Sequence, residues 1–76
     1  MPIESDLRTL SPGQRISRMR VERNITQRTL GKMTGISYAT VSKIENGLVN
    51  VTAHSATQIA NALGCDRDLF LPEDAK

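Results

Sequence analysis

The sequence predicts an all-α fold, a compact bundle of five short helices in one domain. A chain of 76 residues is the size of a single small domain. Hydrophobic residues make up 38% of it but aromatic residues only 3%, so the core must be aliphatic, which favours helices over a β-sandwich. Serine or threonine before apolar runs, and glycine or asparagine after them, recur along the chain as helix start and stop signals.

The two chain ends are predicted to lie outside this bundle. Residues 1–10 show little periodicity, and we expect them to form a flexible arm. Residues 72–76 follow the last apolar residues and are expected to be frayed. The folded domain is therefore predicted to span residues 11–71.

The first predicted helix of the domain runs from Pro12 to Arg23. Ser11 caps it, and proline is favoured at the first helical position because its missing N–H is not needed there. Ile16 and Met19 are three residues apart, so they share one face of the helix and are expected to point into the core.

The stretch from Gln27 to Glu45 reads as two short helices joined by a tight turn. Thr26 is expected to cap the first helix, and Gly35 follows it as the residue that enters a left-handed turn without steric cost. Ser37 then caps a second helix over Tyr38–Glu45. Two helices around a glycine-bearing turn form a helix-turn-helix unit, which reads DNA with its second helix.

Two further helices complete the predicted bundle. Asn46 and Gly47 end the second helix of the unit, and residues 48–51 form a loop. A fourth helix is predicted over residues 53–63, with threonine at its start and glycine at its end. A short last helix over residues 67–70 is expected to close the core with its leucine and phenylalanine.

The ordered set of residues at these helix ends resembles the lambda-repressor-like helix-turn-helix family, of the Cro/C1 or Xre type. The resemblance covers about residues 12–70 and rests on Thr26-Gln27, Gly35, Ser37, Val41-Ser42, Ile44-Glu45-Asn46-Gly47 and Leu63-Gly64. It implies a five-helix DNA-binding domain. It also implies a structural ion pair between Arg20 and Glu45, which would neutralise an acid close to the DNA-facing surface.

The exposed face of the second helix of the unit carries the predicted base contacts. Helical spacing turns Val41 and Ile44 inward and leaves the residues around them outward. Family positions carried onto this chain place the base contacts at Ser37, Tyr38, Ala39, Thr40 and Lys43. In the major groove, lysine donates to guanine O6 and N7, and alanine and threonine contact the thymine methyl group. Tyrosine is expected to hydrogen-bond a phosphate or lie along the sugar edge.

Phosphate contacts are predicted from polar and basic side chains near helix ends. The candidates are Gln27, Arg28, Ser42 and Asn46. Gln27 starts the first helix of the unit, where free N–H groups and the helix dipole favour an anion. In the family, the matching glutamine also braces the recognition helix.

Some residues depart from the family or have a packing role of their own. Gly31 lies where the two helices must come closest, so a small residue is needed there. Thr34 stands where relatives usually carry leucine or methionine, and its hydroxyl is expected to bond the carbonyl four residues back, with Met33 filling part of the gap. Leu48 and Val49 replace loop residues that are often basic, which indicates a protein contact rather than a phosphate contact.

The charges are distributed unevenly along the chain. The formal net charge is only +2, but Glu22 is the only acid between Arg8 and Lys43. Apart from Glu45, the other acids lie before residue 7 and after residue 65. Such a basic body suits a polyanion partner on one face. A solvated basic helix without a partner is the alternative on charge alone.

The composition argues against several other kinds of chemistry. One cysteine allows no internal disulfide, which agrees with a reducing cytoplasm, and we expect a cytoplasmic protein without a membrane segment. Cys65, His54 and Asp66 are too few for a structural zinc site, which takes four ligands, so Cys65 is expected to be an apolar filler. We expect no metal, no cofactor and no enzymatic activity.

The leading functional hypothesis is a sequence-specific transcriptional regulator that binds double-stranded DNA as a homodimer. The candidate dimer contacts are exposed or terminal leucines and a valine: Leu48, Val49, Leu69 and Leu71. The alternative for Leu69 is that it only closes the core. A second functional hypothesis is a protein-interaction module or antitoxin that uses the same bundle to bind a partner protein.

Overall fold

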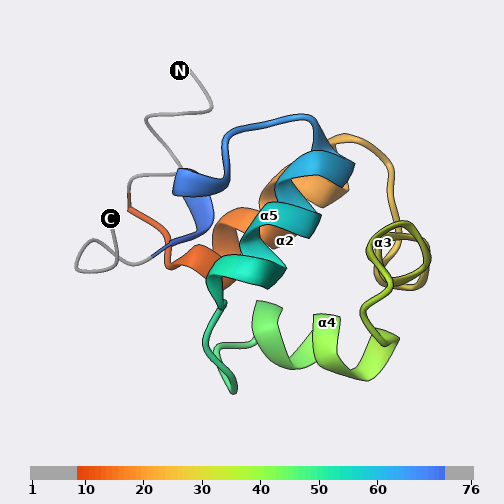
Figure 1. Ribbon diagram of the computed structural model, residues 1–76, viewed down its shortest axis with the longest axis horizontal. Coiled ribbons are helices and arrows are strands. Elements are labelled where there is room, and N and C mark those ends of the chain that lie inside the picture. Colours follow the sequence, from red (N-terminus) through yellow and green to blue (C-terminus); the bar gives the residue numbers. More distant parts are fainter. Residues whose placement is uncertain (1–8, 72–76) are drawn as a thin grey trace.

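A computed structural model describes residues 9–71, and every regular element among them is helical. The elements are α2 (Pro12–Glu22), α3 (Gln27–Thr34), α4 (Tyr38–Glu45), α5 (Ala53–Leu63) and η1 (Arg67–Phe70) (Figure 1). The predicted all-α class is confirmed. The last element is a 3₁₀-helix of four residues, so the described part of the chain has four α-helices and one 3₁₀-helix rather than five α-helices. Tighter 3₁₀ winding is usual for helical pieces this short.

Hydroxyl side chains start all four α-helices, as the sequence predicted. Each accepts a hydrogen bond from the backbone N–H three residues on: Ser11 from Gln14, Thr26 from Thr29, Ser37 from Thr40, and Thr52 from Ser55. Gly35 and Gly64 end α3 and α5 in the left-handed conformation, both at φ 74°. A cap of this kind contributes about 1 kcal/mol, so these short helices depend on their ends.

An aliphatic core lies between α2, α5 and the two helices of the predicted unit. Every helix contributes buried side chains, and the core also takes two residues from the connecting and terminal segments: Ile16, Met19, Leu30, Val41, Ile44, Val51, Ala56, Ile59, Ala60, Leu63, Phe70 and Leu71. Phe70 is fully buried and is the chain's one phenylalanine. The predicted inward faces are therefore confirmed.

Two of the predicted dimer contacts belong instead to this core. Leu71 is only 7% exposed and packs within the protomer. Leu69 is half-buried against the same cluster. Because η1 packs against α2 and α5, these two leucines cover the core at that end of the helices and present little surface to a partner.

The helices α3 and α4 form one side of the molecule. In Figure 1, α3 is viewed nearly along its axis while α4 lies across the view, so the two meet at a steep angle. Both pack on the central helices, since α4 contacts α2 and α3 contacts α5. This arrangement leaves the outer faces of α3 and α4 free of the rest of the described chain.

Two arginine side chains, one in α2 and one at its C-cap, donate hydrogen bonds to backbone carbonyls of distant segments. Arg23 donates to Leu63 O at 2.7 Å, at the end of α5, and Arg15 donates to Leu69 O at 2.9 Å in η1. These bonds were not predicted from the sequence. These two bonds join the end of α5 and η1 to α2 and its C-cap.

The predicted flexible arm and the predicted frayed end fall largely outside the described residues. Residues 1–8 and 72–76 are not described, and of the arm's last two residues Leu10 packs against the core. Within residues 9–71, no helix combines the length and the apolar character needed to cross a bilayer.

Candidate nucleic-acid interface

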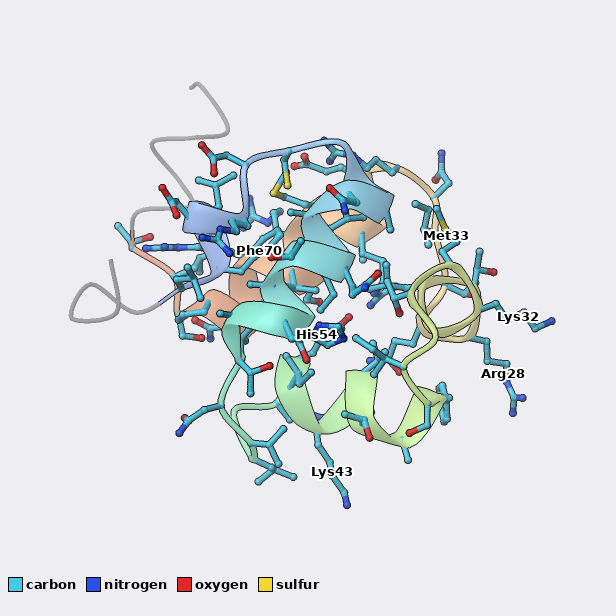
Figure 2. The ribbon with its side chains drawn as sticks, viewed as in Figure 1. Arg28, Lys32, Met33, Lys43, His54 and Phe70 are labelled. Atoms are coloured by element: carbon cyan, nitrogen blue, oxygen red, sulfur yellow. The ribbon has the colours of Figure 1, made fainter. Side chains whose placement is uncertain are left out.

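The exposed face of α4 follows directly from its helical spacing. Val41 and Ile44 are buried at 1% and 3% exposure and fasten the helix to the core. The opposite face exposes Tyr38, Ala39, Thr40 and Lys43, four of the five predicted base-contacting residues. Figure 2 shows the Lys43 side chain extending from α4 away from the body of the protein.

The fifth predicted base contact, Ser37, is committed to the helix cap. Its hydroxyl accepts from Thr40 N at 3.2 Å and is hydrogen-bonded to the Thr40 hydroxyl at 2.9 Å. Ser37 is exposed, but a base would have to compete with both bonds. The same pairing gives the Thr40 hydroxyl a partner within the helix.

Positive charge gathers on the outer face of this pair of helices. Arg28 and Lys32 extend outward from α3, and Lys43 extends outward from α4 (Figure 2). All three are exposed, and the sequence holds no acid between Glu22 and Glu45. The first turns of α3 and α4 contain no acidic residue either. On α3 and α4, an anion approaching this face therefore meets cations and helix N-termini, and residues 23–44 place no carboxylate beside them.

A hydrogen-bonded network behind α4 neutralises the acid that ends it. The Arg20 guanidinium donates from Nε to Glu45 Oε2 at 2.8 Å and from Nη2 to Glu45 Oε1 at 3.0 Å. Gln27 Nε2 also donates to Glu45 Oε1, at 3.1 Å. The side chains of Arg20 and Glu45 are only 13% and 5% exposed. The structure thus brings together the residues of the predicted ion pair, and it ties the end of α4 to the start of α3.

The four predicted phosphate-contacting residues lie at two separate places. Gln27 and Arg28 form the first turn of α3, where Gln27 is half-buried against Glu45 and Arg28 is exposed. Ser42 and Asn46 lie at the end of α4, and Asn46 Nδ2 donates to Ser42 Oγ at 3.4 Å. Both places border the exposed face of α4.

One contact on this face was not predicted. The Arg28 guanidinium carbon lies 5.0 Å from the centroid of the Tyr38 ring, a cation–π distance. Beside them is a hollow of about 290 Å³, which Gly31, Lys32, Ile36 and Ser37 also line. Arg28 and Tyr38 are ten positions apart. The only feature of the sequence that could have predicted their contact is that both lie in the first turns of consecutive helices.

The turn between α3 and α4 has little room to vary. A small residue was predicted at position 31, and the structure requires glycine there, because a β-carbon would lie 2.6 Å from Ile36 O. The Thr34 hydroxyl donates to Leu30 O at 2.8 Å, as predicted, and also accepts from Ile36 N at 3.3 Å. Met33 is 50% exposed, so the expectation that it fills the gap beside Thr34 was wrong.

The cysteine lies away from this face. Burial raises the pKa of the Cys65 thiol above its ordinary value, Arg23 opposes the rise and Asp66 adds to it. Cys65 is half-buried and packs against the core. Within the described residues, no group of three or more metal-binding side chains comes together.

Comparison with known proteins agrees with this geometry. The Helix-turn-helix family model matches residues 16–70. An uncharacterised HTH-type transcriptional regulator of Sinorhizobium fredii, y4wC, is 36% identical over 61 residues, covering 80% of this chain and 43% of the relative. The chain therefore spans less than half the length of that relative.

Two solved structures share the fold and part of the sequence. The P22 c2 repressor protein, in complex with synthetic operator 9T in the presence of Tl⁺, has a TM-score of 0.76 and 31% identity, covering 82% of this chain and 94% of that chain. The solution structure of the P22 c2 repressor DNA-binding domain has a TM-score of 0.77 and 31% identity, covering 90% of each chain. By these matches, the chain belongs to the lambda-repressor-like helix-turn-helix family of the Cro/C1 type.

Proposed function

We propose that this protein is a sequence-specific DNA-binding transcriptional regulator that inserts α4 into the major groove. The observation that carries the proposal is the exposed row of side chains on α4, set in a face with three projecting cations and a neutralised Glu45. A helix of eight residues is about 12 Å long, which suits a groove about 12 Å wide. The repressor bound to its operator, with a similar fold, supports the same use of the bundle.

In this proposal each exposed residue of α4 has a chemical role. Lys43 donates to O6 and N7 of guanine. Ala39 and Thr40 contact thymine methyl groups, and Tyr38 meets the sugar or phosphate edge or a base beside it. Ser37 contributes chiefly through the cap, because its hydroxyl is already bonded to Thr40.

Contacts to the DNA backbone hold the helix in register. Gln27 and Arg28 meet one phosphate at the start of α3, where free N–H groups point outward. Ser42 and Asn46 meet another near the end of α4. Gln27 also supports the recognition helix, because its side-chain amide donates to Glu45 at the end of α4. The same side chain would then link the DNA-backbone contact to that helix.

We further propose that the protein acts as a homodimer on a pseudo-palindromic operator, with recognition helices about 34 Å apart. Leu48 and Val49 are 73% and 42% exposed in the loop after α4. Val49 also lines a groove of about 270 Å³ with Pro12, Ile44 and Val51. The proposed dimer interface is therefore the loop over residues 48–51, and the buried Leu71 is not part of it.

The same loop supports a second candidate function. Two exposed aliphatic residues beside a largely apolar groove would also suit a partner protein, as in an antitoxin. The two functions differ in their dependence on DNA. A protein-interaction module predicts weak or absent binding to duplex DNA and no enrichment of any sequence.

The direct experiment is selection of bound duplexes from a random DNA pool, followed by titration of the enriched duplex at several salt concentrations. We expect one enriched half-site pattern and, if about four phosphates are contacted per protomer, a log–log salt slope of about −3 to −4. Sedimentation of the free and bound protein measures the predicted dimer. Failure to enrich any sequence would contradict the proposed function.

Substitution of Lys43 tests the assigned base contact. Lys43→Ala should weaken binding to the enriched duplex by about 1–3 kcal/mol and relax the preference at one base position. Arg67→Ala is the control, because Arg67 lies in η1 and donates to Thr57 rather than facing outward from α4. Equal losses for Lys43→Ala on enriched and random duplexes would show that Lys43 contacts only the backbone.

A further inference from the structure

Gly13 lies where the start of α2 meets the end of α4. It is the second residue of α2 and is buried. A β-carbon built on Gly13 would overlap Ile44 O and would also lie 3.1 Å from Ile44 C and 3.3 Å from Glu45 Cα. These atoms belong to the backbone of the last turn of α4, so no side-chain rotation can relieve the overlap. The two helices therefore meet backbone to backbone, a contact that only glycine allows.

The local structure around Gly13 gives no other reason for a glycine. Its backbone is helical, and at an ordinary helical position alanine is more favourable than glycine. The Ile44 carbonyl that it faces is held in place, because Ile44 O accepts a hydrogen bond from Gly47 N at 3.1 Å in the turn that ends α4. The contact with α4 is thus what explains the residue at position 13.

The other end of α4 lies against a second glycine. A β-carbon on Gly31 would lie 2.6 Å from Ile36 O and 3.5 Å from Tyr38 N, at the entry to the first turn of α4. Gly31 and Gly13 therefore contact opposite ends of the same helix. Because backbone contacts at both ends leave no flexible side chain between the elements, they define where α4 lies.

We propose that Gly13 is a positioning residue for sequence recognition, because its missing β-carbon lets the last turn of α4 pack directly on α2 and so determines where Lys43 meets its base. The inference rests on the proposed function and adds a residue outside the helix-turn-helix unit to the determinants of sequence preference. A side chain at position 13 should displace α4 rather than α2. The reason is that α2 also packs against α5 and η1, whereas the main contacts of α4 are with α2 and α3.

A small displacement of this turn is enough to change recognition. Hydrogen bonds from N–H groups to oxygen span only about 2.7–3.2 Å, and binding groups must be held within roughly 0.5 Å of their productive positions. Lys43 directly precedes Ile44, so it moves with the displaced carbonyl. A good contact between lysine and guanine discriminates against other bases by about 5- to 150-fold, which leaves a wide range over which a loss can be measured.

The experiment measures sequence preference one position at a time. The duplex enriched from the random pool is compared with duplexes that each carry one changed base pair, and the ratio of the two affinities is the discrimination at that position. Lys43→Ala identifies the position that Lys43 reads. In Gly13→Ala, discrimination there should fall by at least about threefold, while positions unaffected by Lys43→Ala change by less than about twofold. Gly31→Ala, at the other end of α4, should show the opposite pattern.

Gly64→Ala is the matched control for lost stability. Gly64 ends α5 at φ 74°, and a β-carbon there would meet nothing within 4 Å, so the substitution strains the backbone without a clash against α4. Its discrimination should equal that of the unaltered protein at every position. Sedimentation of each variant is a second control, because Gly13 also lines the groove beside Val49. A weaker dimer would lower the affinity for all duplexes alike and leave the ratios unchanged.

A second measurement does not depend on DNA. In the free protein, residual dipolar couplings of the backbone amides report the orientation of α4 relative to α2 and α5. Gly13→Ala should change the couplings most over residues 43–46, and Gly64→Ala should leave them unchanged. If Gly13→Ala melts too low for this measurement, Asn24→Gly is added, because glycine relieves the positive φ of 56° at Asn24 and should raise the melting temperature.

Three results would overturn the inference. Unchanged discrimination at every position in folded Gly13→Ala would show that the contact does not position α4. An equal loss at all positions with unchanged couplings would show a purely structural role. Failure of Gly13→Ala to fold even with Asn24→Gly would mean that the contact holds the fold together rather than placing one helix. An absence of any enriched duplex would contradict the proposed function, and the couplings would still decide whether Gly13 determines the position of α4.

Discussion

Removing the carboxylate of Glu45 should destabilise the whole domain rather than only its DNA-binding face. Glu45 accepts three hydrogen bonds, two from Arg20 and one from Gln27, and its side chain is 5% exposed. In Glu45→Ala, the Arg20 guanidinium, which is 13% exposed in the intact pair, would keep only its bond to Ile25 O. The cost is then that of a stranded, largely buried charge.

The size of the loss in unfolding free energy decides whether Glu45→Ala folds at all. Breaking a buried pair by removing one partner costs about 3–5 kcal/mol. A domain of 76 residues has a total stability of roughly 4–11 kcal/mol. Glu45→Ala should therefore lose a large share of its stability. Replacing both partners, as in Arg20→Met/Glu45→Met, should cost less than Glu45→Ala because no unpaired charge remains.

Urea unfolding followed by circular dichroism measures this effect. With a slope of about 1 kcal/mol per molar urea for a small domain, a loss of 3 kcal/mol moves the midpoint by about 3 M. Glu22→Ala is the matched control, since Glu22 is exposed at the end of α2 and should change stability by less than about 0.5 kcal/mol. Equal and small losses for Glu45→Ala and Glu22→Ala would refute the reasoning, because they would mean that the pair is no stronger than an exposed one.

The remaining predictions concern the turn between α3 and α4 and the cysteine. Gly31→Ala should lose about 1–3 kcal/mol through the clash with Ile36 O, and Gly35→Ala about 1–2 kcal/mol through its left-handed backbone, both measured by urea unfolding. Thr34→Val should lose about 1–2 kcal/mol, because the Ile36 N–H loses its acceptor, and Thr34→Ser should lose less. Because burial raises the pKa of Cys65, the unfolded chain ionises first, so stability should fall as pH rises above 9.0, and Cys65→Ala should remove that part of the loss.

Local rules were enough to predict the helix boundaries. Caps and left-handed glycines act within three or four residues, so Ser37 and Gly35 identify the ends of α4 and α3 without any tertiary information. The inward faces of the helices followed from periodicity for the same reason. The prediction of a short helix over residues 67–70 was correct in position, but its 3₁₀ winding was not foreseen.

Contacts made by long side chains across elements were harder to predict. Arg23 reaches a carbonyl 40 residues away, and Arg28 reaches a ring in the next helix, because the helices happen to bring these positions within range. Leu71 was predicted to be a dimer contact because it lies near the chain end, but it follows η1 into the core and is buried there. The Arg20–Glu45 pair was expected only through the family resemblance, since spacing alone gives no reason to join two residues 25 positions apart.

Nuclear magnetic resonance titration tests the central claim most directly. The enriched duplex would be added to the labelled protein, and the amide signals of residues 37–46 would be followed alongside those of η1. If α4 enters the major groove, signals of residues 37–46 and of the first turn of α3 should shift while those of η1 stay nearly constant. Unchanged signals over residues 37–46 in a saturated complex would contradict the account.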